Sequence, residues 1–147
     1  MDCLTLRKRD GVALQPTKEG FDLGIVTSNG DEMLAFYRDV LGLEFEATLN
    51  MEQVGIAQMH RLWANKSLLK LVVPVADVPA GATGGITGAT GLRYFTFNVG
   101  NFEEVMTACE DAGANIIWRR LEARPGVVVG MVEDPDGNWV EFIDNPG

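Results

Sequence analysis

The fold is decided by residues 21–45, FDLGIVTSNGDEMLAFYRDVLGLEF, whose pattern returns in residues 94–117, YFTFNVGNFEEVMTACEDAGANII. In each stretch a short strand-like run gives way to apolar residues at the spacing of one helix face. Asn29 can cap the first helix, and Glu32 can reach back to the backbone amide of the cap, which makes a capping box. The same two residue types recur 72 positions later. A repeated cap is more specific than repeated hydrophobicity, so we predict an internal duplication.

Three strands are expected after each helix. Their ranges are 44–49, 55–63 and 68–73 in the first half, and 115–118, 126–132 and 139–143 in the second. All six are rich in Val, Ile, Leu and Trp, which favour strands, and the last two of each half are joined by residues that suit tight turns. Each half is therefore a βαβββ module, and the fold class is α+β.

A glycine-rich stretch divides the chain. We predict an N-terminal arm over 1–20, a first module over 21–73, a flexible glycine-rich linker over 74–91 and a second module over 92–147. Each module alone is too small to bury an adequate core, so the two are expected to fold as one cooperative domain.

Composition excludes several classes of protein. The 147 residues are 46% hydrophobic and carry a net charge of −9, which is typical of a globular protein and disfavours nucleic acid as a partner. No apolar run is long enough to span a membrane, and the start of the chain lacks the apolar stretch of a secretory signal, so a cytoplasmic protein is expected. Cys3 and Cys109 show no disulfide or metal-binding spacing.

Two motifs resemble a known family. The helix signature AFYRDVLGLEF at 35–45, the hairpin EDPDGNWVEFID at 133–144 and the paired modules are similar to the vicinal oxygen chelate superfamily. That superfamily includes glyoxalase I, methylmalonyl-CoA epimerase, extradiol dioxygenases, and fosfomycin and bleomycin resistance proteins. The resemblance covers 21–145 and implies two modules that form a half-open barrel around one cavity. It also implies a small-molecule ligand and a homodimer, but it does not select a reaction.

The resemblance also points to four positions that hold a metal ion in metal-using members. Carried onto this chain, they are Asp22, Lys70, Tyr94 and Glu141, of which only Glu141 has the usual ligand identity. A protonated lysine has no lone pair and repels a cation, so no metal cofactor is expected. The alternative, a divalent ion held by Asp22 and Glu141 with or without His60, stays open. His60 is the only histidine, which excludes an extradiol dioxygenase site built from two histidines within the chain.

These four residues suggest proton-transfer chemistry in place of the metal. Glu141 can act as a general base, Lys70 can stabilise a developing enolate or bind a carboxylate, and Tyr94 and Asp22 can orient the substrate. We therefore predict a metal-independent isomerase, epimerase or lyase that acts on a small carbonyl or carboxyl compound. The alternative is a binding or drug-resistance protein in which Lys70 forms a salt bridge with Glu141 or Asp22 and catalyses nothing.

The remaining candidates depend on how the strands pair. If Ala64 and Ser67 close a two-residue turn, Arg61 lies opposite Lys70 and His60 points to the helix side of the sheet; a slip of one residue places His60 in the cavity, where it could join catalysis. We also expect four substrate-binding residues, two aromatic and two cationic. They are Trp139, Trp63, Arg93 and Arg61.

Overall fold

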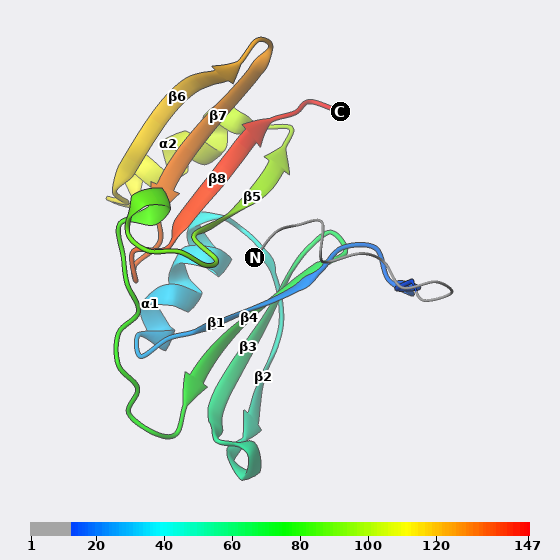
Figure 1. The fold of residues 1–147 in the computed structure, drawn as a ribbon, viewed down its shortest axis with the longest axis vertical. Helices are drawn as coiled ribbons and strands as arrows, with labels where there is room; N and C mark the ends of the chain where they lie inside the picture. Colours follow the sequence, from blue (N-terminus) through cyan, green and yellow to red (C-terminus); the bar gives the residue numbers. More distant parts are fainter. Residues whose placement is uncertain (1–12) are drawn as a thin grey trace, which may run out of the picture.

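The computed structural model describes residues 13–147 (Figure 1). It contains two four-stranded sheets with the same strand order, β1-β4-β3-β2 and β5-β8-β7-β6. Cys3 and the basic residues Arg7, Lys8 and Arg9 of the predicted arm lie outside the described residues.

The first module has the predicted βαβββ order. Its elements are β1 (Asp22–Val26), α1 (Gly30–Leu34), the π-helix η2 (Ala35–Val40), β2 (Glu44–Met51), the 3-10 helix η3 (Glu52–Val54), β3 (Ile56–Ala64) and β4 (Ser67–Pro74). Strand β1 pairs with β4 in parallel, and the other pairs of this sheet are antiparallel.

The second module repeats this order after the short 3-10 helix η4 (Gly85–Thr87) in the linker. Its elements are β5 (Tyr94–Val99), α2 (Phe102–Asp111), β6 (Ile116–Arg124), β7 (Val127–Glu133) and β8 (Trp139–Asp144). Here β5 pairs with β8 in parallel. Strand β6 runs six residues beyond the predicted end at 118, because its outer part pairs with β7 in a long hairpin.

The helix caps differ from the expected capping box, and they differ in the same way in both modules. Asn29 occupies the N-cap position but makes no side-chain bond to the helix backbone. Its side-chain amide instead donates to the Glu32 carboxylate at 3.1 Å, and Asn101 donates to Glu104 at 3.2 Å. The predicted cap residues are therefore correct, but they bind each other rather than the backbone. This shared departure supports an internal duplication.

The first helix also changes its winding, which the apolar spacing did not predict. From Ala35 onward it is a π-helix, in which Leu41 N–H donates to the carbonyl of Phe36 five residues back. Met33 and Tyr37 nevertheless share the buried face, as expected. Gly42, with φ of +73°, ends the helix.

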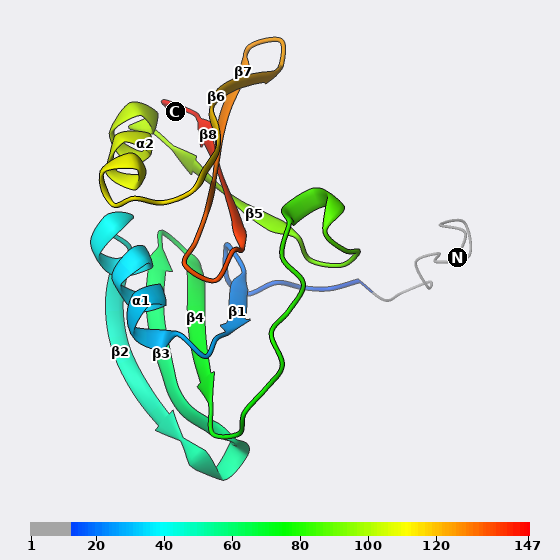
Figure 2. The ribbon, with the colours of Figure 1, turned by 90° about the vertical axis from the view of Figure 1, so that its left-hand side faces the viewer.

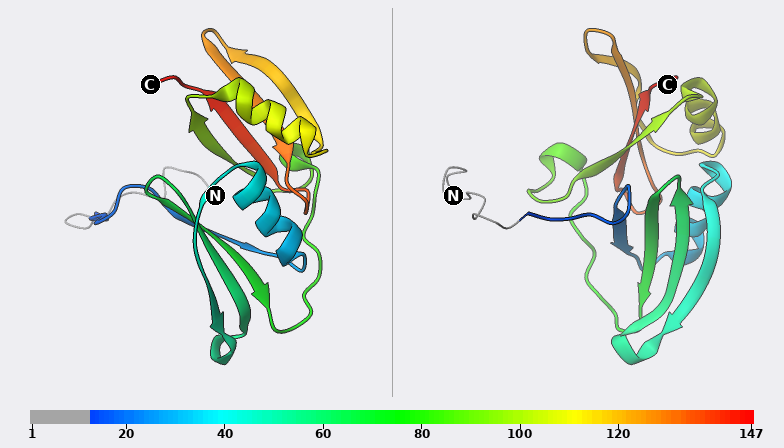
Figure 3. Two further views of the ribbon diagram at one scale, coloured as in Figure 1. Left: turned by 180° about the vertical axis from the view of Figure 1, so that it is seen from behind. Right: turned by 90° about the vertical axis from the view of Figure 1, so that its right-hand side faces the viewer.

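One core joins the two modules. Both helices lie on the same side of the two sheets (Figures 2 and 3). The buried cluster takes Met33, Phe36, Tyr37, Leu62, Leu69 and Leu71 from the first module and Phe102, Met106, Cys109, Val132, Val140 and Phe142 from the second. No helix within residues 13–147 is both long and apolar enough to cross a membrane.

Polar contacts reinforce this junction. The buried hydroxyl of Tyr37 donates to Asp134 Oδ2 at 2.7 Å, and the Thr27 hydroxyl donates to Asp136 Oδ2 at 2.5 Å. Burial raises the pKa of Tyr37, and the neighbouring Asp134 carboxylate adds to the rise. The turn between β7 and β8 is thus bound to the first module as well as to its own sheet.

Candidate functional site

The predicted catalytic residues lie on the sheet faces that point away from the helices. Leu69 and Leu71 belong to the core, so Lys70 between them points to the opposite face of the first sheet. By the same alternation, Val140 and Phe142 place Glu141 on the opposite face of the second sheet. Since both helices cover the same side, both of these faces open to the other side (Figure 3).

The strand register makes the four family positions equivalent. In the first sheet Asp22 pairs with Leu68 and Gly24 with Lys70. In the second sheet Tyr94 pairs with Trp139, and Thr96 pairs with Glu141. Asp22 and Tyr94, 72 residues apart, therefore occupy the same place in the two sheets, as do Lys70 and Glu141, which are 71 residues apart.

The face of the first sheet carries paired charges. Lys70 Nζ lies 3.5 Å from Asp22 Oδ2, and Lys18 forms a second ion pair with the same carboxylate. The hydrogen bond from Lys18, together with the charges of both lysines, lowers the pKa of Asp22 against a smaller opposing effect of burial. Two ammonium groups share one carboxylate, so this cluster keeps one positive charge.

Arg61 and Trp63 lie on this face too, but both are engaged within the protein. Arg61 Nε donates to Glu46 Oε2 at 2.6 Å, and Trp63 Nε1 donates to Glu46 Oε1 at 2.8 Å. The Lys18 ammonium lies 4.8 Å from the centroid of the Trp63 ring.

The face of the second sheet is aromatic around one carboxylate. Glu141 Oε1 accepts a hydrogen bond of 2.7 Å from the Thr96 hydroxyl. The rings of Trp139 and Trp118 meet edge to face, with centroids 6.2 Å apart. Tyr94 is 49% exposed. Thr96 was not among the residues predicted from the sequence, because only the strand register shows that it lies across the parallel pair from Glu141.

The structure brings these residues together in two groups. Asp22 contacts Lys70 in the first module, and Glu141 contacts Thr96 in the second. Within residues 13–147 no hydrogen bond or ion pair connects the first group to Glu141 or Tyr94. The salt bridge between Lys70 and Asp22 that the sequence allowed is present, whereas none with Glu141 is recorded in the described part of the chain.

His60 does not belong to this site, so its predicted catalytic role is corrected. Ala64 pairs with Ser67 and Arg61 with Lys70, which is the register that turns His60 to the helix side. The ring is 4% exposed, and its Nδ1 lies 2.7 Å from the Thr48 hydroxyl. Burial lowers the pKa of His60.

Arg93 was expected to bind substrate, but its guanidinium contacts the linker. Its guanidinium donates to the carbonyls of Gly85 at 2.8 Å, Thr83 at 3.1 Å and Ala82 at 3.2 Å. These three hydrogen bonds hold residues 82–88 of the linker against the second module.

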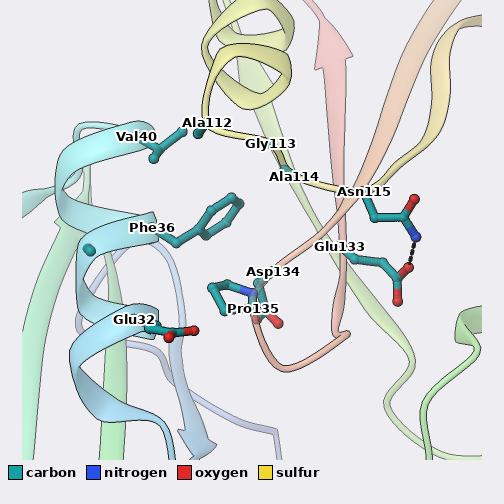
Figure 4. A pocket seen from close by; sticks show the side chains of 11 residues that line it. Glu32, Phe36, Val40, Ala112, Gly113, Ala114, Asn115, Glu133, Asp134 and Pro135 are labelled. Atoms are coloured by element: carbon teal, nitrogen blue, oxygen red, sulfur yellow. Dashed lines mark hydrogen bonds between the residues drawn. The ribbon is translucent and has the colours of Figure 1, made fainter.

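The molecule has two hollows, and only the larger one reaches any of these residues. A groove of about 370 Å³ between α1 and the α2–β6 connection is lined by Phe36, Val40 and Asp134 among others (Figure 4). A larger cleft of about 1060 Å³ lies between the modules, and Leu43 and Val99 line it from opposite sides. Asp22, Trp63 and Thr96 reach the larger cleft, but Lys70, Tyr94 and Glu141 line neither hollow.

The donor set does not fit the metal ion that many related proteins bind. Of the four equivalent positions, Lys70 is a cation and cannot bind a metal ion, and it is already paired with Asp22. Glu141 is then the single carboxylate at these positions that has no ion-pair partner among the described residues. Within residues 13–147, no group of three or more His, Cys, Asp or Glu side chains is placed to hold a metal. We therefore derive no step that passes through a metal ion.

Comparison with protein families defines the class of this chain. Residues 21–142 match the model of the Glyoxalase/Bleomycin resistance protein/Dioxygenase superfamily, and the chain belongs to this superfamily. The half-open arrangement of two modules is the fold that the resemblance implied.

Solved structures are similar over nearly the whole described chain. A glyoxalase family protein from Enterococcus faecalis is 24% identical, with a TM-score of 0.68 over 86% of this chain and 98% of its own. A lactoylglutathione lyase from Agrobacterium tumefaciens is 25% identical, with a TM-score of 0.63 over 88% and 95%. A glyoxalase/dioxygenase from Nostoc punctiforme is 15% identical, with a TM-score of 0.72 over 95% and 100%. Comparison with curated proteins gave no match.

Proposed function

We propose that this protein is an enzyme that moves a proton on carbon, next to the carbonyl or carboxyl group of a small molecule, without a metal ion. The observation that carries the proposal is the state of Glu141. One carboxylate oxygen is fixed by Thr96, and the other has no hydrogen-bond partner within residues 13–147. A carboxylate that is oriented through one oxygen and free at the other is suited to act as a general base.

In the proposed reaction Glu141 removes a proton from the carbon, and the C–H electron pair moves toward the neighbouring oxygen, which becomes an enolate. The positive charge of the Lys70 cluster stabilises this oxygen, and the Tyr94 hydroxyl donates a hydrogen bond to it. Return of the proton to a different face or carbon completes an isomerisation or epimerisation. Expulsion of a leaving group by the same electron pair completes a lyase reaction.

Asp22 has a positioning role in this scheme. It lies between two lysines and holds Lys70 through an ion pair, while the second lysine prevents full neutralisation. Loss of Asp22 leaves two neighbouring ammonium groups without their shared partner. The site is then more positive but less ordered, and we expect the substrate to be held less well.

The test begins with a thermal-shift screen over small oxo-acids, CoA thioesters and thiol conjugates, followed by a search for products from each stabilising compound. Glu141→Gln should reduce turnover about 10²- to 10⁴-fold, the usual contribution of a general base, with little change in ligand affinity. Glu52→Gln is the matched control, because Glu52 is exposed and its side chain has no recorded partner within residues 13–147. Equal turnover in both variants would reject Glu141 as the base.

A second candidate function is ligand binding without turnover, which the large cleft between the modules favours. Its volume of about 1060 Å³ can hold a small molecule, and apolar side chains from both modules line it. In this case stabilising compounds yield no product, and Leu43→Trp, which projects a larger ring into the cleft, reduces the thermal shift. Under the enzyme proposal, Leu43→Trp leaves turnover at Glu141 largely intact.

We also propose that the chain forms a homodimer. Exposed apolar side chains lie at or beside the edge strands β1 and β5, where Phe21 is 85% exposed, Val26 58% and Leu92 92%. A second copy of the chain packed along these edges would bury these side chains. Light scattering should give about twice the mass of one chain, and the charged variants Phe21→Glu and Leu92→Glu should halve it. A location in the cytoplasm stays a prediction.

A further inference from the structure

Residues 82–88 of the linker, called the strap from here on, cover the ring of Trp139. Gly85 is buried against the indole, with φ of +58°, and a Cβ at this position would overlap ring atoms Cε2 and Cδ2. Figure 2 shows η4, the helical turn of the strap, on the side of the second sheet away from α2. The strap therefore occupies the ring surface of Trp139 on the same face as Glu141.

Three hydrogen bonds from one side chain hold the strap in place. The Arg93 guanidinium donates to the carbonyls of residues 82, 83 and 85, and Arg93 directly precedes β5, so the sheet fixes its backbone. Gly137 in the β7–β8 turn adds a close approach, because a Cβ there would lie 3.1 Å from Thr83 Cγ2. Apart from these contacts, most of the strap is exposed.

One polar group beside the strap is unsatisfied, on the nitrogen bonded to the Cε2 atom that Gly85 covers. Trp139 Nε1 is buried and has no hydrogen-bond partner within residues 13–147. A buried donor without an acceptor costs free energy, since the same N–H is hydrogen-bonded when water reaches it. This cost opposes the closed position, whereas the Arg93 hydrogen bonds favour it.

We infer that the strap is a cover that lifts to admit a ligand, and that the Trp139 indole is the surface it uncovers. The planar part of the ligand takes the place of Gly85 on the ring face. The Nε1–H points outward in the plane of the indole, so it donates to an oxygen that a flexible link carries past the edge of the ring. The ligand class is therefore a planar apolar group that bears a carbonyl or carboxylate oxygen on a flexible link. This inference rests on the proposed function only in placing the ligand on the Glu141 face.

The exposure of Trp139 reports the position of the strap. Acrylamide quenching is measured for each protein and for its Trp139→Phe counterpart, so that the difference isolates Trp139 from the other two tryptophans. In Gly85→Ala the added methyl group clashes with the Trp139 ring, and Arg93→Ala removes the three hydrogen bonds that hold the strap. In both variants the fraction of molecules with the strap lifted should rise about tenfold or more. Gly81→Ala, which has open space around its Cβ, and Arg124→Ala, on an exposed hairpin, are the matched controls and should not differ from wild type.

Binding of 2-naphthylacetate, a planar ring with one carboxylate on a flexible methylene link, tests the ligand class. Gly85→Ala should bind it about tenfold more tightly than wild type, and adding Trp139→Phe, which keeps an aromatic ring but removes the N–H, should reverse that gain. Circular dichroism verifies that each variant is folded. Wild-type quenching and wild-type binding in both Gly85→Ala and Arg93→Ala would overturn the inference.

Failure of the proposed function gives a different result. The quenching and naphthylacetate measurements do not depend on turnover, so they can succeed although Glu141→Gln leaves turnover unchanged. That combination would reject the catalytic role of Glu141 and retain the strap. Loss of turnover in Glu141→Gln together with wild-type quenching in both strap variants would reject only the strap.

Discussion

The two modules have the same strand register but different side chains on their open faces. Where Gly24 lies across from Lys70 in the first sheet, Thr96 lies across from Glu141 in the second. Without a side chain at position 24, Lys70 turns to Asp22, whereas Thr96 fixes Glu141. The two modules therefore share their positions but not their chemistry: one face has a net positive charge, and the other has an oriented carboxylate beside aromatic rings.

The largest effect on stability is expected at the core that the two modules share. Phe142 of the second module is 2% exposed and stacks on Phe97 with centroids 6.0 Å apart, and Phe36 of the first module is 5% exposed. Phe142→Ala and Phe36→Ala should each lower the free energy of unfolding by about 3–5 kcal/mol. Both should show one transition by fluorescence and by circular dichroism. Two separate transitions would mean that the modules fold independently.

A smaller loss is expected at the polar contact between the modules. Tyr37→Phe removes the hydroxyl that binds the buried Asp134 carboxylate, whose pKa is raised mainly by burial. Leaving that group short of a partner should cost about 1–3 kcal/mol, measured by urea unfolding. Tyr94→Phe is the matched control on the open face and should change stability by less than about 0.5 kcal/mol. Similar losses of stability in Tyr37→Phe and Tyr94→Phe would show that the contact with Asp134 contributes nothing specific.

The buried His60 gives the first module a titratable group with no counterpart in the second, because it is the only histidine of the chain. Burial lowers the pKa of His60 in the folded protein, so below the ordinary histidine pKa of about 6.5 the unfolded chain binds the proton more readily. Stability should therefore fall as pH drops from about 6.5 toward the lower folded pKa, by at most about 1.4 kcal/mol per pH unit. His60→Gln should flatten this part of a denaturation series measured between pH 7 and 5. An unchanged slope would show that other groups cause it.

The smallest effect on stability is expected at Lys70. The Lys70 side chain is 30% exposed and that of Asp22 is 40% exposed, so the ion pair is screened by solvent. Lys70→Met should change the free energy of unfolding by less than about 1 kcal/mol. The same variant should strongly reduce turnover, since its charge has no substitute on the second face. A large loss of stability with normal turnover would make Lys70 a structural residue.

Most of the fold could be predicted from the sequence because the patterns that specify it are local and occur twice. Apolar spacing located the helices, and the turn at Ala64–Ser67 offered the register that the structure adopts. The π-helix was not predictable, because its apolar spacing over two turns resembles that of an α-helix.

The site was harder to predict because its key contacts connect residues far apart in the chain. The four family positions are on the expected faces, but the partner of Glu141 depends on a parallel strand pair 45 residues apart. Arg93 was expected to bind substrate because it adjoins Tyr94. Its sequence neighbourhood does not reveal that the linker folds back over it. His60 could be placed only after the register was known.

The central claim is that Glu141 is a base that works without a metal ion, opposite a positive Lys70 cluster. Its most direct test is the exchange of the proton on the substrate carbon with solvent. Protein treated with a chelator is incubated in D₂O with the stabilising compounds from the ligand screen, and deuterium incorporation is followed by NMR. We predict incorporation by the wild type, and a drop of about 10²- to 10⁴-fold in Glu141→Gln. Incorporation that stops on chelation, or that Glu141→Gln leaves unchanged, would contradict the account.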